Sequence, residues 1–289
     1  MTKTLTAQQF FQQFPDDDAC LNHLFRVRFQ GISHCPKCKR ETKFHRVTGQ
    51  PAFSCQWCGH HLHPMVGTPF AKSHTALQKW FYAIYLFTTT RHGVPAKELQ
   101  RQLAVTYKTA WRMGHEIRKY MAVVDGDRPL SGTVEVDETL IGGGQKGVGP
   151  GNRVTGNKAI VFGMIERGGQ IMTKVVASTK RESLFPIIDA NIVKGSTIYS
   201  DEYATYRVLP WRGYKHETVN HAAKEYARGA VHTNSIENMW GQLKRSIRGT
   251  HINVSPKHLQ KYLGEFEFRF NLRKAPHLMF DRLLMNFGK

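Results

Sequence analysis

Two Cys-x-x-Cys pairs near the start of the chain restrict its local fold more than any other feature of the sequence. Cys35 and Cys38 form the first pair, Cys55 and Cys58 form the second, and 16 residues separate the pairs. Each pair turns two thiolates toward one side of a metal ion, and two pairs complete a tetrahedral site. Five cysteines in 289 residues are too few for a disulfide scaffold. We therefore predict a structural zinc ribbon, with unligated thiols as the alternative.

The surroundings of the cysteine pairs fit a small module that spans residues 1–66. Residues 44–53 predict two strands joined by a turn at Thr48–Gln50. Residues 6–30 predict helical structure in front of the ribbon, and Cys20 is expected to be a small core residue. Three further potential ligands are expected to lie on the surface instead: His60, His61 and His63.

A helical segment follows at residues 72–124. Residues 94–103 and 106–113 predict two helices separated by a two-residue turn, which is the spacing of a helix-turn-helix. On the second helix, Lys108 and Arg112 would face a DNA major groove. A plain helical hairpin is the alternative, because helix pairs of this kind are common.

From Gly132 onward the pattern changes to strands, and we assign residues 130–280 to one catalytic domain. The predicted order is three strands, a helix, a strand, a short helix, a strand and a helix. This is the layout of a ribonuclease-H-like fold, an α/β architecture with a mixed sheet and helices on both faces. The elements are expected at residues 133–141, 159–166, 170–177, 183–192, 196–200, 216–220 and 236–247.

Three acidic residues of this domain are predicted to meet. Asp137 lies in the first strand, Asp201 follows the fourth, and Glu237 lies in the first turn of the last helix. Phosphoryl transfer to DNA uses two hard cations about 3.5–4 Å apart, and Mg²⁺ takes one or two carboxylates per ion. The trio would meet this need. Each residue taken singly also has a purely structural explanation. The two aspartates could be turn or cap residues, and Glu237 could simply stabilise the positive end of the helix dipole.

Other residues compete for roles in this site. Glu135 shares a strand face with Asp137, whereas Glu138 points to the other face. Lys244 follows Glu237 by two helical turns on the same face, where it would hold a phosphate. The third metal-binding position stays open between Glu237 and its neighbours, and the remaining competitors are Glu202, Asn234 and Asn238.

The charge of the chain indicates a polyanionic partner. Lys and Arg number 41 against 22 Asp and Glu, a net charge of +19, and the basic residues extend along the whole chain. The sequence has no run of about 18 apolar residues and therefore does not indicate a membrane span. The N-terminus lacks a signal peptide, so we expect a cytoplasmic protein. Further DNA contacts are expected from Lys146 and Arg153 in a glycine-rich loop and from Arg245 and Arg248.

Several long motifs resemble those of a known family, the bacterial insertion-sequence transposases of the ISXO2-like group, which carry an N-terminal zinc ribbon and an integrase-like DDE domain. Thirty-five residues separate Asp201 from Glu237, as in retroviral integrases and many insertion-sequence transposases. Met239 stands where the family pattern leads us to expect Phe. The motifs are the two cysteine pairs, residues 134–139 (VEVDET), 141–143 (IGG), 199–206 (YSDEYATY), 232–240 (HTNSIENMW), 254–263, 265–266 and 269–271.

The resemblance implies a transposase that binds the inverted-repeat ends of its element, hydrolyses a phosphodiester there and joins the freed 3′-hydroxyl to target DNA. It implies Mg²⁺ or Mn²⁺ at Asp137, Asp201 and Glu237, structural Zn²⁺ at the cysteines, and a homo-oligomer of at least two chains on double-stranded DNA. Two other classes of function stay open at this stage: a zinc-ribbon regulator that only binds DNA, and a ribonuclease-H-like nuclease that cuts without joining.

Overall fold

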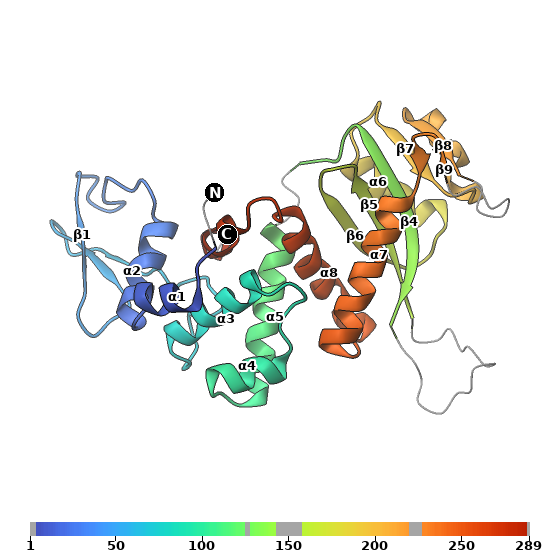
Figure 1. Cartoon of the computed structure of the whole chain (residues 1–289). Coiled ribbons are helices and arrows are strands. Elements are labelled where there is room, and N and C mark those ends of the chain that lie inside the picture. Colours follow the sequence, from blue (N-terminus) through green and yellow to red (C-terminus); the bar gives the residue numbers. More distant parts are fainter. Residues whose placement is uncertain (1–3, 125–127, 143–157, 220–226, 288–289) are drawn as a thin grey trace. The chain divides into compact units, whose positions relative to one another are not determined.

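The computed structural model describes residues 4–124, 128–142, 158–219 and 227–287 (Figure 1). The glycine-rich loop with Lys146 and Arg153 lies outside these described residues, and so the contacts expected of it stay predictions.

The chain divides into two compact units. The first contains the chain up to Thr90, then Val94–Tyr120 and the segment from Ala275 onward, whereas the second contains Arg91–Gly93 and Met121–Lys274. No helix in the described ranges combines the length and the apolar character that a membrane span requires.

The zinc ribbon of the first unit is a three-stranded antiparallel sheet in the order β1-β2-β3. Its strands are β1 (Phe44–Arg46), β2 (Phe53–Cys55) and β3 (His61–Leu62). Gly49 takes φ +76° in the connection between β1 and β2, a conformation that favours glycine. The predicted strand-turn-strand between the cysteine pairs is confirmed.

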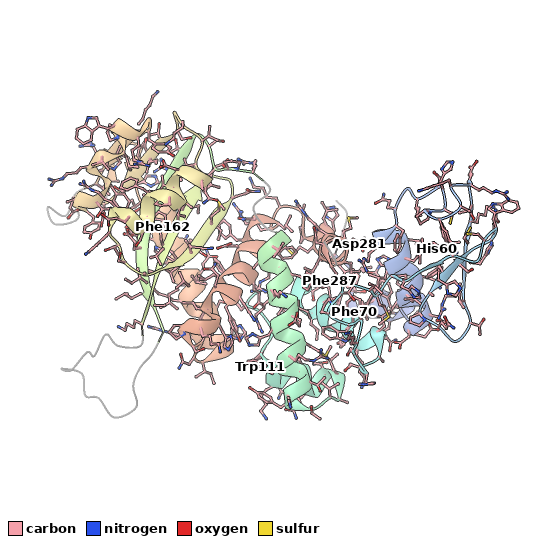
Figure 2. The ribbon with its side chains drawn as sticks, turned by 180° about the vertical axis from the view of Figure 1, so that it is seen from behind. His60, Phe70, Trp111, Phe162, Asp281 and Phe287 are labelled. Carbon is pink, nitrogen blue, oxygen red and sulfur yellow. The ribbon has the colours of Figure 1, made fainter. Side chains whose placement is uncertain are left out.

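Helices form the rest of the first unit. Thr6 begins the first of them with a capping box, because its hydroxyl accepts from the Gln9 amide while the Gln9 side chain accepts from the Thr6 amide. The C-terminal helix α9 packs against α2 and α3. Figure 2 shows Phe70 and Phe287, whose rings meet edge to face at 5.5 Å. The helices are α1 (Ala7–Gln13), α2 (Asp17–Arg28), α3 (Leu77–Thr89), α4 (Ala96–Leu103), α5 (Tyr107–Val124) and α9 (Met279–Asn286).

Helices α4 and α5 form the predicted pair with its short turn. Pro95 is the N-cap of α4, and Ala104 ends that helix in the left-handed conformation at φ +48°. The hydroxyl of Thr106 then accepts a hydrogen bond from the Thr109 amide at 3.2 Å and caps α5. Ala104 and Thr106 therefore mark the two boundaries of the turn, and Pro95 marks the start of the pair.

The second unit is built on a five-stranded mixed sheet in the order β6-β5-β4-β7-β8. Within this sheet, β4, β5 and β6 pair antiparallel. Strand β7 pairs in parallel with β4, and β8 pairs in parallel with β7. The strands are β4 (Thr133–Ile141), β5 (Ala159–Glu166), β6 (Ile171–Val176), β7 (Thr197–Ser200) and β8 (Lys215–Thr218). This order confirms the predicted ribonuclease-H-like fold.

Each face of the sheet has its own core. Val134, Val136 and Phe162 pack on one face with α6 (Arg181–Asn191) and the short helix η2 (Ala204–Val208). A second short helix, η3 (Pro210–Arg212), follows η2. Figure 2 labels Phe162 in this layer. Residues Val161 and Ile165 pack on the other face with α7 (Asn234–Ser246) and α8 (Pro256–Asn271). Alternation along each strand thus gives helices on both faces, as predicted.

Two elements near α7 were not expected from the sequence. A short antiparallel hairpin, β9 (Ala227–Arg228) with β10 (Val231–His232), leads into α7. A π-helical turn, η5 (Ile247–His251), extends the same helix at its other end.

Candidate active site

The sheet register brings two of the three predicted acidic residues together. Parallel pairing of β4 with β7 aligns Thr133 with Thr197 and Glu135 with Tyr199. The same register continued by two residues places Asp201, the first residue after β7, opposite Asp137. The two residues meet because parallel pairing in this register puts them side by side on neighbouring strands.

The third acidic residue comes from α7, which packs on β4 and β5. Glu237 lies in the first turn of α7, with its side chain exposed. Its Oε1 accepts a hydrogen bond from the Thr233 hydroxyl at 3.0 Å. The charge of Glu237 is close enough to act on Asp137, whose pKa it raises.

Trp240 and Gly163 complete the surroundings of Asp137. The indole Nε1 of Trp240 donates a hydrogen bond to Asp137 Oδ2 at 2.9 Å. Gly163 is the cross-strand partner of Asp137, and a Cβ at this glycine would lie 2.5 Å from Cη2 of Trp240. The missing side chain therefore makes room for the indole ring. The sequence did not lead us to expect a role for either residue in the site. Trp240 could have been found, because it lies three residues after Glu237, on the same side of the helix and in the same motif.

The acidic side chains disfavour one another's charge. Burial raises the pKa of Asp137 to about 6; hydrogen bonds from the Glu138 amide and Trp240 oppose this rise, and the charges of Asp201 and Glu237 add to it. Burial likewise raises the pKa of Glu138 to about 7. Bound cations would relieve this repulsion, so the electrostatics suit a cation site.

Glu138 faces the opposite side of the sheet, as its place in the strand predicts. Its Oε1 accepts a hydrogen bond of 2.5 Å from the hydroxyl of Tyr206, a buried residue of η2. Burial raises the pKa of Tyr206 well above its usual range, and the Glu138 charge adds to this effect. Glu138 is thus held within the α6 side of the second unit.

Glu135 shares the face of Asp137 and is fully buried beneath the start of α7. Its carboxylate accepts hydrogen bonds from the Ser235 amide at 2.8 Å and the Ile236 amide at 3.0 Å. Arg167 donates to the same carboxylate at 2.7 Å. These contacts distinguish Glu135 from Asp137, which lies two residues further along β4.

The donor atoms fit divalent cations of the hard class, because carboxylate oxygens are the ligands that Mg²⁺ and Mn²⁺ prefer. Within the described ranges, four cysteines are the only group of three or more His, Cys, Asp or Glu residues whose ligand atoms all lie within 4.8 Å of one another. The acidic trio is more widely spaced.

The other predicted residues lie on several elements. Lys244 is half-buried on α7, and Arg245 and Arg248 are exposed. On α5, Lys108 is exposed, whereas Arg112 stacks over the Trp80 ring at 5.5 Å and also donates to Ser73. Three remaining competitors for the acidic site are exposed: Glu202, Asn234 and Asn238.

The cysteine cluster has the geometry of a structural zinc site. The Sγ atoms of Cys35 and Cys58 lie 3.6 Å apart, and those of Cys38 and Cys55 lie 3.9 Å apart. The hydroxyl of Thr42 contacts Cys55 Sγ at 3.3 Å and supports the cluster from outside. The nearby histidines are not part of the cluster, in agreement with the prediction.

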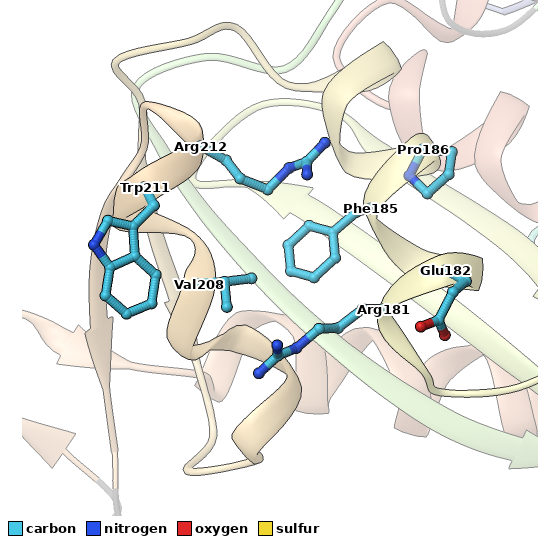
Figure 3. A pocket seen from close by; sticks show the side chains of 7 residues that line it. All are labelled: Arg181, Glu182, Phe185, Pro186, Val208, Trp211 and Arg212. Carbon is cyan, nitrogen blue, oxygen red and sulfur yellow. The ribbon is translucent and has the colours of Figure 1, made fainter.

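Two hollows lie on the second unit. One lies between α6 and the short helices, where Phe185 sits between Arg181 and Arg212 and Trp211 is 82% exposed (Figure 3). None of the predicted catalytic residues lines it. The other includes the residues directly after Asp201 and carries mixed charge; its lining residues are Glu202, Tyr203, Arg207, His216, Glu217, Thr218 and Arg228.

Two family models match the chain. Residues 129–271 match the ISXO2-like transposase domain, and residues 15–61 match the transposase zinc-ribbon domain. These two ranges contain the acidic trio and the four cysteines, respectively.

Two curated proteins are similar over different lengths. An uncharacterized protein in transposable element ISH50 of Halobacterium salinarum is 28% identical over 281 residues, which is 91% of this chain and 94% of that protein. An uncharacterized transposase-like protein of Haemophilus influenzae is 33% identical over 103 residues, 35% of this chain and 81% of that protein.

Two solved structures are similar at low sequence identity. The Mos1 strand transfer complex matches with a TM-score of 0.31 and 13% identity, over 67% of this chain and 73% of that chain. A pre-cleavage Mos1 transpososome matches with a TM-score of 0.27 and 12% identity, over 67% and 74% of the two chains.

Proposed function

The chain belongs to the family of ISXO2-like insertion-sequence transposases, and on this basis we propose that Asp137, Asp201 and Glu237 form its catalytic centre. The observation that supports this assignment is electrostatic. Three carboxylates come from β4, from the end of β7 and from α7; burial raises the pKa of Asp137 to about 6, and the charges of Asp201 and Glu237 add to this rise. Carboxylates gathered in this way are a common feature of catalytic metal sites.

The centre would bind Mg²⁺ or Mn²⁺. Asp137 is suited to contact both ions, because Asp201 lies beside it on the sheet and Glu237 lies above it on α7. Bound ions would supply the charge that activates the attacking oxygen and stabilises the leaving oxygen. The hydrogen bond from Trp240 to Oδ2 would hold the Asp137 carboxylate in one orientation for metal binding.

The reaction would proceed in two phosphoryl transfers without a covalent enzyme intermediate. In the first, water attacks phosphorus at the element end, the P–O3′ bond breaks, and a 3′-hydroxyl is released. In the second, this hydroxyl attacks a phosphodiester of the target DNA, a new P–O bond forms, and a target 3′-hydroxyl leaves. Each step forms one P–O bond and breaks another at a single phosphorus atom, so the same carboxylates would serve both.

DNA would reach the centre through basic residues. Lys244 lies two turns after Glu237 on α7, and Arg245 and Arg248 are exposed further along the same helical segment. A chain of net charge +19 attracts the DNA backbone irrespective of its sequence. The helix pair α4–α5, with Lys108 and Arg112 on α5, is the proposed reader of the element's inverted repeats. Two element ends must be processed together, so the active complex would contain at least two chains.

The test is a joining assay with full-length protein, labelled element-end DNA and plasmid target in Mg²⁺. We expect joined products from the wild type and a loss of about 100-fold or more in Asp201→Asn. The matched control is Glu202→Gln, which neutralises the exposed neighbouring carboxylate and should keep most of the activity.

Three outcomes would contradict the proposal. Nicking without joining would identify a nuclease, binding without either reaction would identify a regulator, and full activity of Asp201→Asn would exclude this carboxylate from catalysis. Zinc content and thermal melting of each variant would show that it is folded.

A further inference from the structure

We propose that Glu135 is a positioning residue, whose buried carboxylate fixes the first turn of α7 and so sets the place of Glu237 against Asp137. The inference rests on the proposed catalytic role of Glu237 and Asp137. It adds a residue that acts on the site through a helix and not through contact with DNA or metal.

The cap of α7 comes from a distant part of the chain. Thr233 is the N-cap residue of this helix, but its side chain makes no capping hydrogen bond. Its hydroxyl donates instead to Glu237 Oε1. The Ser235 and Ile236 amides, which a local cap would ordinarily satisfy, both donate to Glu135 Oε2 at 2.8 and 3.0 Å. Glu135 thus replaces the local cap and leaves Thr233 to orient Glu237.

The second carboxylate oxygen of Glu135 connects the start of α7 to the β9–β10 hairpin through Arg167. Glu135 Oε1 accepts from the Ser235 hydroxyl at 2.9 Å and from Arg167 Nε at 2.7 Å. Arg167 also donates to the carbonyl oxygens of Ala230, at 2.6 Å, and His232, at 2.9 Å. The ion pair between the buried Glu135 and the partly exposed Arg167 therefore connects the strand, the hairpin and the start of the helix.

The geometry excludes Glu135 as a rival metal ligand. Its side chain is 0% exposed, and both oxygens are occupied by the Ser235, Ile236 and Arg167 donors. Removing a buried carboxylate from such donors leaves several of them unsatisfied, which is costly. Asp137, on the same face of β4 two residues later, has one oxygen held by Trp240. The strand therefore carries an anchoring acid and a catalytic acid side by side.

Glu237 lies close in sequence to Ser235, the residue of α7 that Glu135 holds. Glu237 follows Ser235 by two residues, within the first helical turn. Loosening the cap would therefore displace Glu237 more than it would displace the far end of α7, because helices fray from their ends. Misplacement of a metal-binding group by about 1 Å is enough to lower a rate by about 100-fold.

The test uses Glu135→Gln in the full-length protein, with Glu166→Gln as the matched control. Glu166 also forms an ion pair in this sheet, with Arg128 at 2.8 Å, but within the described residues its side-chain hydrogen bonds go to Arg128 and the Ser131 amide and not to α7. Two measurements are made: hydrogen exchange of the peptide that covers Ser235–Trp240, without added Mg²⁺, and joining activity as a function of Mg²⁺ concentration.

For Glu135→Gln we expect exchange in this peptide to become about tenfold faster, as loss of a helix cap predicts. The Mg²⁺ concentration for half-maximal joining should rise by about tenfold, with partial recovery of activity at high Mg²⁺. Glu166→Gln should change neither quantity. If Glu135→Gln does not fold, Ser235→Ala removes one donor to the carboxylate and should shift both measurements in the same direction by a smaller amount.

Two outcomes would overturn the proposal. Unchanged exchange at α7 with unchanged Mg²⁺ dependence would mean that Glu135 does not position the helix. Complete loss of joining at every Mg²⁺ concentration, with unchanged exchange, would mean that Glu135 acts directly in the site. The exchange measurement needs no activity, so it stays informative even if the joining assay shows that the proposed catalytic role is wrong.

Discussion

Trp240 donates a hydrogen bond from its indole Nε1 to Oδ2 of Asp137 at 2.9 Å. Together with the contact of Glu135 to the Ser235 amide, this bond connects β4 and α7 at two points, one at each acidic residue of the strand face. The helix that carries Glu237 is thus attached to the strand that carries Asp137, and the site is fixed by side chains as well as by packing.

The first prediction concerns Trp240→Phe, which keeps an aromatic ring but removes the donor. Loss of a hydrogen bond to a charged group should lower the free energy of unfolding by about 1–2 kcal/mol. Joining activity should fall as well, because Asp137 would lose its fixed orientation. Urea denaturation followed by circular dichroism measures the first effect. Trp211→Phe is the control, since Trp211 is largely exposed and its replacement should change stability by less than about 0.5 kcal/mol. Equal stabilities of the two variants would contradict the prediction.

A second prediction follows from the close approach of Gly163 and Trp240. In Gly163→Ala the new Cβ would lie 2.5 Å from Trp240 Cη2, so the ring must move. Overpacking of this kind should destabilise the protein by about 1–3 kcal/mol. Adding Trp240→Phe removes the atoms that clash, so the double variant should lose less stability than the sum of the two single variants.

The control for this substitution is Gly249→Ala. A Cβ at Gly249 has no neighbour within 4 Å, so this variant should be neutral or slightly more stable. Strict additivity of Gly163→Ala and Trp240→Phe in urea denaturation would show that the two positions are not coupled.

Features that depend on neighbours in sequence could be predicted. The alternation of Val134 and Val136 with Glu135 and Asp137 predicted the strand and its two faces, and the cysteine spacing predicted the ribbon. The turn at Ala104 could be located from capping residues on either side of it. In each case, the physical cause acts over a few residues, so the pattern alone contains it.

Features that depend on distant neighbours could not be predicted. Glu135 lies 100 residues before Ser235, and nothing near it indicates a helix that needs a cap. The need for glycine at position 163 follows only from the strand register, which puts Gly163 opposite Asp137. Helix α9 packs in the first unit because Phe280 meets Phe14 and Phe81, which are far away in sequence. Such contacts require the assembled tertiary structure.

Metal removal provides a third prediction. Cys38→Ser, or a chelator, should remove zinc and unfold the β1-β2-β3 ribbon, because structural zinc contributes about 10–16 kcal/mol of apparent binding free energy in small domains. Zinc analysis and limited proteolysis would detect both changes. Cys20→Ser is the control: this thiol is buried in α2, where burial raises its pKa to about 12, and it lies outside the zinc cluster. Loss of zinc from Cys20→Ser with retention in Cys38→Ser would refute the assignment of ligands.

The last prediction concerns Asp189, which joins the end of α6 to the segment around η3. Burial alone would raise the pKa of Asp189, but hydrogen bonds from Arg212, Lys194 and Tyr214 outweigh it and hold the pKa at about 2. The unfolded value is about 3.9. Because the folded value is lower, the ionised carboxylate stabilises the fold above about pH 4, and this contribution is lost as the pH falls toward 2.

Asp189→Asn should therefore be less stable than the wild type at pH 7, by about 1–2 kcal/mol after allowance for solvent screening of this partly exposed group. The difference should shrink steadily below about pH 4, because the carboxyl of the unfolded wild type then binds a proton that the folded protein does not bind until the pH approaches 2. Urea denaturation of both proteins from pH 7 to pH 3 measures the difference, and the low-pH values serve as the internal control. A difference that stays constant over this range would show that Asp189 contributes through its shape and not through its charge.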